Sequence, residues 1–278
     1  MAAQAQPGFR RLVIALGASR DSLARLELWA DLASRLGADL SGLFVEDADL
    51  LRMAALPFAT VVGTDSVPRA LDMPTLERLL RRAAAEARAA LEAHAARRAV
   101  RWSFESIRAG AAGEVVGSVG SEDLVIVEAA AFGPTSRAAL LGCTASVLYL
   151  RPQAPLARRV LVAVRGDGGA EDEALLATAA HLAAASGAVL SVLVPEGDGA
   201  RERAVREALA RVLGTETGLE VEVLRGDAAR LERLLEEERG AVLVSAEELG
   251  PGRAEVGVAL EEMACSVLLV RRGARGEA

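Results

Sequence analysis

The chain has 278 residues and a formal net charge of −7, and all of its basic residues are arginines. This length suits two domains better than one core. The acidic balance argues against a nucleic-acid-binding body, because neutralising phosphates needs a basic face, and the lack of lysine excludes a P-loop or Schiff-base lysine.

Short, β-branched apolar runs alternate with segments of helical spacing along the first half. Runs such as 123–129 and 146–151 carry almost no charge and suit strands buried on both faces of a parallel sheet. Gly37 ends one helix in the position that favours a left-handed backbone, and Pro74 lies in the first turn of the longest one. We expect strands at 10–16, 39–45, 100–108, 123–129 and 146–151, and helices at 23–36, 73–99, 111–119 and 135–143. This β-α order predicts a parallel, doubly wound sheet.

The second half repeats the order of the first. Residues 158–164 match 10–16, residues 186–194 match 36–44, and the final runs 240–246 and 266–271 match the last two strands of the first half. The sequence therefore predicts two tandem domains of five strands each. The proline-containing stretch at 152–155 places the boundary between domains 1–154 and 155–278.

The first half carries about thirty more residues than the second between its second and third strands, part of which is an insertion at 46–72. Its stretch Leu50–Gly63 is too apolar for a plain solvated loop. It is either an arm packed on its own domain or a lid or partner-docking surface.

The repeated features resemble the universal stress protein (UspA) family in its tandem two-domain form. They are Gly37-Ala and Gly187-Ala before the second strands, Arg108-x-Gly110 and Arg225-Gly226 after the third, and the ending Ala264-Cys-Ser-Val-Leu-Leu-Val270. The resemblance covers about 10–272. It implies five-stranded parallel α/β domains of the adenine-nucleotide α-hydrolase, Rossmann-like type. It also implies pairing through the fifth strands, which here could join the two halves as a pseudo-dimer within the chain; further dimerisation stays open.

Family members that bind ATP share an Asp at the end of strand one and a Gly-x2-Gly-x9-Gly-Ser/Thr loop after strand four. This sequence departs from both. Strand one ends in Ala15-Leu-Gly17 or Ala163-Val-Arg165. The segments from Glu128 to Ala145 and from Ser245 to Cys265, ends included, have only 18 and 21 residues. A parallel connection needs most of that length for its return helix. We therefore expect the loop to be deleted, with 135–143 and 253–264 as return helices, and Glu128, Glu247 and Glu248 where phosphates would sit.

The favoured hypothesis is a tandem universal stress protein that acts in a stress response by binding proteins or small ligands, without ATP and without catalysis. One alternative is an atypical ATP site formed by Gly17, Ser19, Gly110 and Gly133, or by Gly166, Asp167 and Gly226. Another is a regulatory domain that docks on a transporter or kinase through Leu50–Gly63.

Other patterns add no site. The turn at 166–169 lacks the dinucleotide-binding register and predicts a flexible turn. His94 and His181 have no partner at metal-ligand spacing. No run of ~18 apolar residues predicts a membrane span, the start lacks a signal pattern, and Cys143 and Cys265 make no disulfide framework. A soluble cytoplasmic protein is expected, with both cysteines buried.

Overall fold

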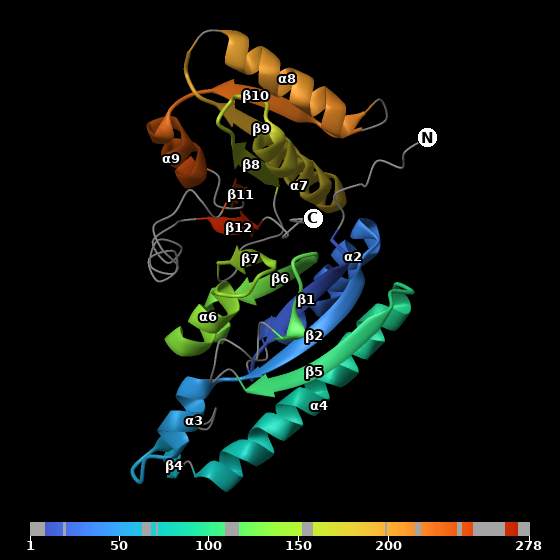
Figure 1. The fold of residues 1–278 in the computed structure, drawn as a ribbon. Helices are drawn as coiled ribbons and strands as arrows, with labels where there is room; N and C mark the ends of the chain where they lie inside the picture. Colours follow the sequence, from blue (N-terminus) through green and yellow to red (C-terminus); the bar gives the residue numbers. More distant parts are fainter. Residues whose placement is uncertain are drawn as a thin grey trace, which may run out of the picture.

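The computed structural model of the chain describes residues 9–18, 21–62, 68–70, 72–108, 117–151, 158–197, 199–214, 218–237, 241–246 and 265–271. Its two halves lie one above the other and share a continuous sheet (Figure 1). The helix expected at 111–119 is described only at its last residues, and the return helix expected at 253–264, with Glu247 and Glu248, lies outside the described residues.

The first half contributes five strands to the large sheet, forms the two-stranded sheet of the insertion and contains the long helix α4. Its elements are β1 (Arg11–Leu16), α1 (Asp21–Ala24), α2 (Leu26–Leu36), β2 (Asp39–Glu46), α3 (Ala48–Ala54), β3 (Thr60–Val62), β4 (Pro68–Ala70), α4 (Met73–Arg97), β5 (Trp102–Arg108), β6 (Asp123–Glu128), η1 (Ala129–Ala131), α6 (Pro134–Leu141) and β7 (Ser146–Leu150).

The second half repeats this plan without the insertion. Its elements are β8 (Arg159–Ala163), α7 (Ala170–Ser186), β9 (Val189–Val194), α8 (Gly199–Leu213), β10 (Val221–Arg225), α9 (Ala228–Glu237), β11 (Ala241–Ala246) and β12 (Ser266–Val270).

The sheet confirms the predicted doubly wound topology. The strand order is β10-β9-β8-β11-β12-β7-β6-β1-β2-β5, so each half has its own strands in the order 3-2-1-4-5. Within this sheet the strands of each half pair parallel. The two fifth strands, β7 and β12, pair antiparallel with Leu148 opposite Leu268. The expected pseudo-dimer within the chain is therefore confirmed.

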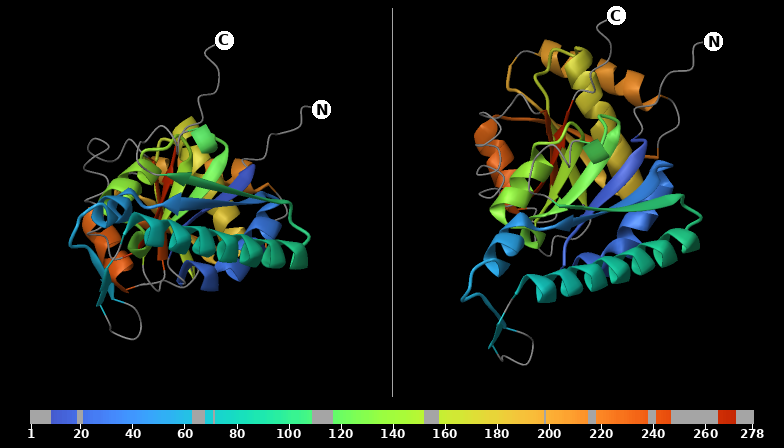
Figure 2. Two further views of the ribbon diagram at one scale, coloured as in Figure 1. Left: turned by 90° about the horizontal axis from the view of Figure 1, so that it is seen from below. Right: turned by 60° about the horizontal axis from the view of Figure 1, so that its bottom comes forward.

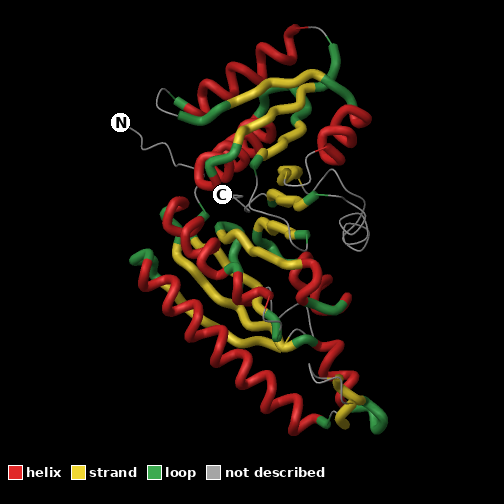
Figure 3. Tube along the Cα trace, turned by 180° about the vertical axis from the view of Figure 1, so that it is seen from behind, coloured by secondary structure: helices red, strands yellow, loops and turns green. Residues whose placement is uncertain are grey.

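Helices cover both faces of this sheet (Figure 3). One face packs α2, α4, α7 and α8 against the alternate strand residues that include Leu12, Phe44 and Val192. The other packs α6 and α9 against the intervening residues, such as Val13 and Tyr149. Strands buried on both faces need apolar residues at nearly every position, which is the pattern that the sequence carries.

Local signals set most helix ends where the sequence places them. Gly37 and Gly187 have φ of 63° and 68° and end α2 and α7, which non-glycine residues do only with strain. Asp72 caps α4 by accepting from the Thr75 N–H. The prediction of a single helix at 23–36 was wrong, because the helix is interrupted at Arg25, which has a ψ of −3°. The Arg25 side chain lies 3.9 Å from the Glu128 carboxylate.

Polar groups reinforce the joint between the halves in a near-symmetric way. The Arg151 N–H donates to Ser266 Oγ at 3.3 Å, and the Arg271 N–H donates to Ser146 Oγ at 3.2 Å. The Arg271 guanidinium also donates to the Leu141 carbonyl at the end of α6. Within the described residues, no helix has the length and apolar character needed to cross a bilayer.

Candidate functional site

Each half has a switch point, where the connections of two neighbouring strands leave in opposite directions at one end of the sheet. In the first half this is the carboxyl end of β1 and β6, and in the second half that of β8 and β11. Doubly wound sheets bind ligands at these switch points. Backbone N–H groups and helix N-termini there can hold an anion.

In the first half the chain closes directly over the end of β1. A Cβ added at Gly17 would stand 3.0 Å from the Ala131 carbonyl oxygen and 3.4 Å from the Phe132 ring. Phe132 is buried. The short turn η1 and helix α6 therefore follow β6 with no glycine-rich loop between them. The deleted loop and the return helix expected at 135–143 are confirmed in this half.

The N-terminus of α6 already holds a carboxylate, supplied by the insertion. The Gly133 N–H donates to Asp47 Oδ2 at 2.7 Å, and the Ser136 hydroxyl donates to Asp47 Oδ1 at 3.0 Å. Asp47 is 7% exposed and also caps α3 through the Asp49 N–H. A negative charge at this end of a helix is stabilised by the helix dipole and the free N–H groups.

Asp49 fills the rest of the same helix end. It accepts from the Thr135 N–H at 3.1 Å and from the Thr135 hydroxyl at 3.0 Å. Arg52 donates to it at 2.7 Å. A Cβ added at Gly133 would overlap the Asp49 carboxylate. Two carboxylates of the chain itself thus occupy the donors that an external anion would use.

The second half has the same arrangement with one carboxylate. The turn after β8 aims the N–H groups of Arg165, Gly166 and Gly168 at Asp172, each at 3.0 Å. Asp172 lies in the first turn of α7 and is fully buried. Gly166 and Gly168 have φ of 83° and 66°, a backbone that glycine adopts freely. The turn therefore binds an anion, the carboxylate of Asp172, through three backbone N–H groups. The sequence analysis expected a flexible turn here, and that expectation was wrong.

The other predicted residues of this half do not face a common space. Asp167 turns back to accept from the Gly169 N–H, which lowers its pKa. The first turn of α8 lies over Gly166, where Arg201 packs on the turn. Gly226 lies under the stem of Arg230 and continues the β9 ladder by donating to the Val194 carbonyl.

Of the residues proposed for a nucleotide, Gly17 and Gly133 are near each other: a Cβ added at Gly17 would meet the ring of Phe132, the residue before Gly133. Ser19 and Gly110 lie outside the described residues. Glu128, expected to place negative charge at this edge, ends β6 and faces Arg25.

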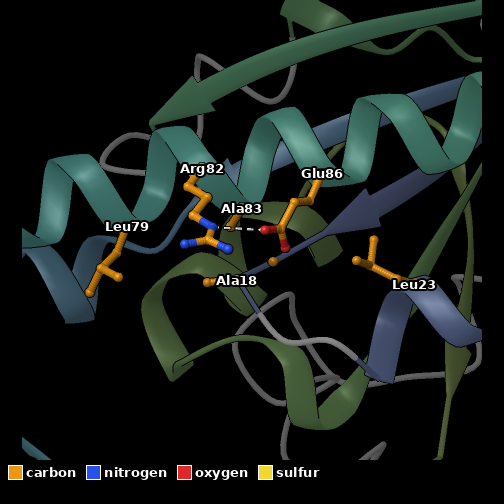
Figure 4. Close-up of a pocket in the computed structure, with 7 residues that line it drawn as sticks. Ala18, Leu23, Leu79, Arg82, Ala83 and Glu86 are labelled. Atoms are coloured by element: carbon orange, nitrogen blue, oxygen red, sulfur yellow. Dashed lines mark hydrogen bonds and ion pairs between the residues drawn. The ribbon is translucent and has the colours of Figure 1, made fainter. Parts of the chain in front are cut away.

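A pocket of about 370 Å³ opens beside the end of β1, where the predicted residue Gly17 lines it; the sequence analysis did not identify the side of it that α4 forms. Figure 4 shows it between the β1 end, α1 and α4. Ala18, Leu23, Leu79 and Ala83 give it an apolar lining. Arg82 and Glu86, one turn apart on α4, pair along its rim at 2.9 Å. The signal was the helical spacing of 79, 82, 83 and 86 on one side of α4, hidden in an arginine-rich helix.

This pocket has the size of a small-molecule site and an amphipathic character. Among the described residues that line it, the charged groups are one arginine and one glutamate that pair with each other, so this lining suits a compact apolar or zwitterionic ligand better than a triphosphate. Leu79 remains half exposed at the mouth.

Cysteine and histidine side chains of the chain have pKa values shifted mainly by burial. Burial raises the pKa of both Cys143 and Cys265, which keeps the thiols protonated and unreactive. Burial, followed by the charge of Arg97, lowers the pKa of His94 on α4. Among the described residues no cluster of His, Cys, Asp and Glu could hold a metal ion.

Comparison with known proteins places the fold. No family model matches the sequence, and no curated protein matches it. A universal stress protein from Archaeoglobus fulgidus superposes with a TM-score of 0.59 over 97% of this chain and 99% of its own, at 16% identity. The chain has the universal stress protein fold. A Pseudomonas aeruginosa protein described as a universal stress protein gives a TM-score of 0.55 at 16% identity, over 96% and 95% of the two chains.

A domain of a transport protein also resembles this chain in structure. The cytoplasmic domain of a prokaryotic cation chloride cotransporter matches with a TM-score of 0.52 at 13% identity, over 98% of both chains. At these identities the likeness concerns fold alone.

Proposed function

We propose that this chain is a tandem universal stress protein, with domains 1–154 and 155–278, that serves a cytoplasmic stress response by binding and not by catalysis. In this proposal it binds a protein or a small ligand and does not use ATP. The fold supports the family-level part of the proposal, and the site must support the rest.

The observation that carries the proposal is the occupation of both anion-binding positions by carboxylates of the chain. Asp47 and Asp49 take the α6 donors, and Asp172 takes those of the β8–α7 turn. A phosphate entering either position would have to displace a bonded carboxylate and tolerate its charge nearby. The neutral pocket beside Leu79 and Arg82 is the better place for a small ligand.

Thermal unfolding with and without millimolar ATP, ADP and Mg²⁺ tests this proposal. A ligand at ~100 times its Kd stabilises the folded state by about 2.7 kcal/mol, a shift of a few degrees. We expect no shift for the native chain. The Asp49→Ala variant is the matched comparison, because it frees the Thr135 N–H while Asp47 still holds the Gly133 N–H. A clear shift in the native chain overturns the proposal.

That outcome would favour the first alternative, an atypical nucleotide site. It would use Gly17 and Gly133 with Ser19 and Gly110, or Gly166 with Asp167 and Gly226. The arginine at the pocket rim then offers a second test: Arg82→Ala should weaken the shift if the nucleotide enters through the pocket beside α4, and leave it unchanged if the second half binds.

The second alternative, a regulatory domain that docks on a transporter or kinase, is favoured by the exposed apolar residues Met53, Leu56, Phe58 and Val62 in the insertion. A deletion that tests docking should remove 55–70 and spare Asp47 and Asp49, because those carboxylates hold α6. Loss of transporter binding with an unchanged melting temperature would support docking.

A further inference from the structure

The far end of the insertion displays apolar side chains to water. We call residues 53–62 the tip; this stretch contains no charged residue. Phe58 is 77% exposed, Val62 60%, Met53 48% and Leu56 45%. Among the described residues, Leu79 is the one other large apolar side chain exposed to this degree. Exposed apolar residues gathered in one place mark an interaction surface.

The tip is held out by a fixed base. Ala48 and Ala54 of α3 are buried, and Leu50 and Leu51 pack against the core. The carboxylates of α3 and the residue before it are bonded to α6. Both views of Figure 2 place α3 and the adjoining strands at one end of the molecule, beyond the sheet. The packed arm and the docking surface therefore coexist: the base is packed and the tip is exposed.

The strands of the insertion form a small sheet that is incomplete by itself. β3 and β4 pair antiparallel over three residues, Thr60 opposite Ala70 to Val62 opposite Pro68, and form a sheet of two strands. A two-stranded hairpin is marginal in water unless further strands or a packed face support it. Here the described apolar side chain of the hairpin, Val62, faces water.

Charge selects the occupant of this surface. Two charged groups at the base of the tip already have partners: Arg52 pairs with Asp49 at 2.7 Å, and Asp72 accepts from the Thr75 N–H at 2.7 Å. A strongly acidic or basic partner would gain nothing here. A second copy would bring the same neutral, apolar surface, whereas elsewhere two chains of charge −7 repel each other.

The fold also leaves few other places for two chains to meet. The fifth strands, through which universal stress proteins were expected to pair, are consumed inside this chain. The edge strands of the sheet are β5 and β10. Glu105 and Arg108 are exposed on β5, and β10 carries Glu222 and Arg225; charged side chains on an edge strand discourage pairing with another chain.

We propose that two copies of this chain associate about a two-fold axis through their tips. Phe58 and Leu56 of each copy cover those of the other, and the two β3–β4 hairpins lie against each other in one assembly. A two-fold contact uses the same patch on both copies. The patch is smaller than a standard stable interface, so the dimer dissociates on dilution. This inference stands independently of the ligand that the chain binds.

Sedimentation velocity of the full chain over a wide concentration range tests the dimer. We expect a reversible monomer–dimer equilibrium, weakened at least about tenfold by Phe58→Ser or Leu56→Ser, a loss typical of removing an interface anchor. Both residues face water, so neither change should alter the melting temperature. Leu79→Ser is the matched control, because Leu79 is 50% exposed but lies at the pocket, and it should leave dimerisation unchanged.

A cross-link tests the geometry. Cys143 and Cys265 are each 1% exposed, so Phe58→Cys adds the one readily accessible thiol. A short bis-maleimide should link Phe58→Cys chains into covalent dimers but leave Leu79→Cys chains monomeric.

The proposal is overturned if the native chain stays monomeric at every concentration, or if the serine changes at the tip leave the dimer intact. A monomer that sediments with phosphatidylcholine vesicles and loses this on Phe58→Ser would identify a lipid surface as the occupant instead. Equal cross-linking of the two cysteine variants would also contradict a contact at the tip.

Discussion

The two halves of this chain have the same strand order but use the switch-point edge differently. In the first half, anion-binding donors of α6 are filled from a distance, by carboxylates of an insertion 86 residues away in sequence. In the second half they are filled locally, by Asp172 only six residues after Gly166. The first half keeps a pocket beside α4, whereas α8 packs over the corresponding turn of the second.

The comparison shows that the backbone donors of a ligand-binding switch point can be retained when carboxylates of the chain itself take the place of the ligand. Donors of a helix end or a turn need an acceptor whether or not a phosphate is present. The second half meets this need with one buried residue. The first half meets it with the insertion, which is thereby anchored and free to present its tip.

The largest expected effect is that of removing the carboxylate in the second half. In Asp172→Ala three N–H groups lose their acceptor. One of these hydrogen bonds is buried and two are partly buried. A buried unsatisfied donor destabilises by about 1–3 kcal/mol, so we expect the free energy of unfolding to fall by about 3 kcal/mol. Urea denaturation followed by far-UV circular dichroism measures this loss.

Asp172→Asn is the control, because its amide oxygen still accepts one or two of these bonds at the same volume. It should lose clearly less stability than Asp172→Ala. If both variants unfold at the urea concentration of the native chain, the turn does not depend on its internal anion.

A smaller effect is expected from Asp47→Ala in the first half. This change removes the cap of α3 and one acceptor of α6, and a lost cap destabilises by about 0.5–2 kcal/mol. Asp49 still holds the Thr135 N–H, so we expect a loss of about 2 kcal/mol, below that of Asp172→Ala.

Fluorescence makes the comparison between the halves direct. Trp29 and Trp102 are the two tryptophans of the chain, and both lie in the first half. Asp47→Ala should therefore shift the fluorescence transition at least as much as the circular dichroism transition. If Asp47→Ala lowers the free energy of unfolding more than Asp172→Ala does, Asp47 and Asp49 do not share the stabilisation of α6 as we infer.

Much of the fold could be predicted from the sequence because its causes are local or repeated. Charge-free β-branched runs indicate strands buried on both faces, and Gly37 and Gly187 mark helix ends through backbone conformation. The pairing of β7 with β12 followed from resemblance. The break at Arg25 was missed because it goes with a contact to Glu128, a hundred residues away.

The site was harder to predict because its decisive contacts join distant side chains. Nothing in the sequence near Gly133 indicates that Asp47 would bond its N–H. Asp172, with acidic neighbours in the first turn of α7, resembles ordinary helix-dipole complementation. The count of residues after Glu128 did predict the deleted loop, because a return helix needs a minimum length.

The contact between α6 and the insertion can be isolated with a double-mutant cycle. Gly133→Ala places a methyl group against the Asp49 carboxylate and should destabilise the first half, since overpacking forces neighbours to move. In an Asp49→Ala background the same change has room. We expect a coupling free energy of about 1 kcal/mol, measured by urea denaturation. Strictly additive losses would mean that Asp49 does not lie against Gly133.

The smallest effect concerns His181, on α7 where the halves meet. Burial lowers its pKa, partly opposed by a hydrogen bond to the Leu36 carbonyl of α2, and its Nε2 is buried without a hydrogen-bond partner among the described residues. The unfolded chain therefore binds this proton at a higher pH than the folded chain. Stability should rise with pH through the region of the ordinary histidine pKa, about 6.5, and fall as the pH drops below it, by at most about 1.4 kcal/mol per pH unit for one proton.

His181→Gln should flatten this slope in both the fluorescence and the dichroism transitions, because the residue links both halves. A slope unchanged by His181→Gln but removed by His94→Gln would assign the effect to the surface of α4.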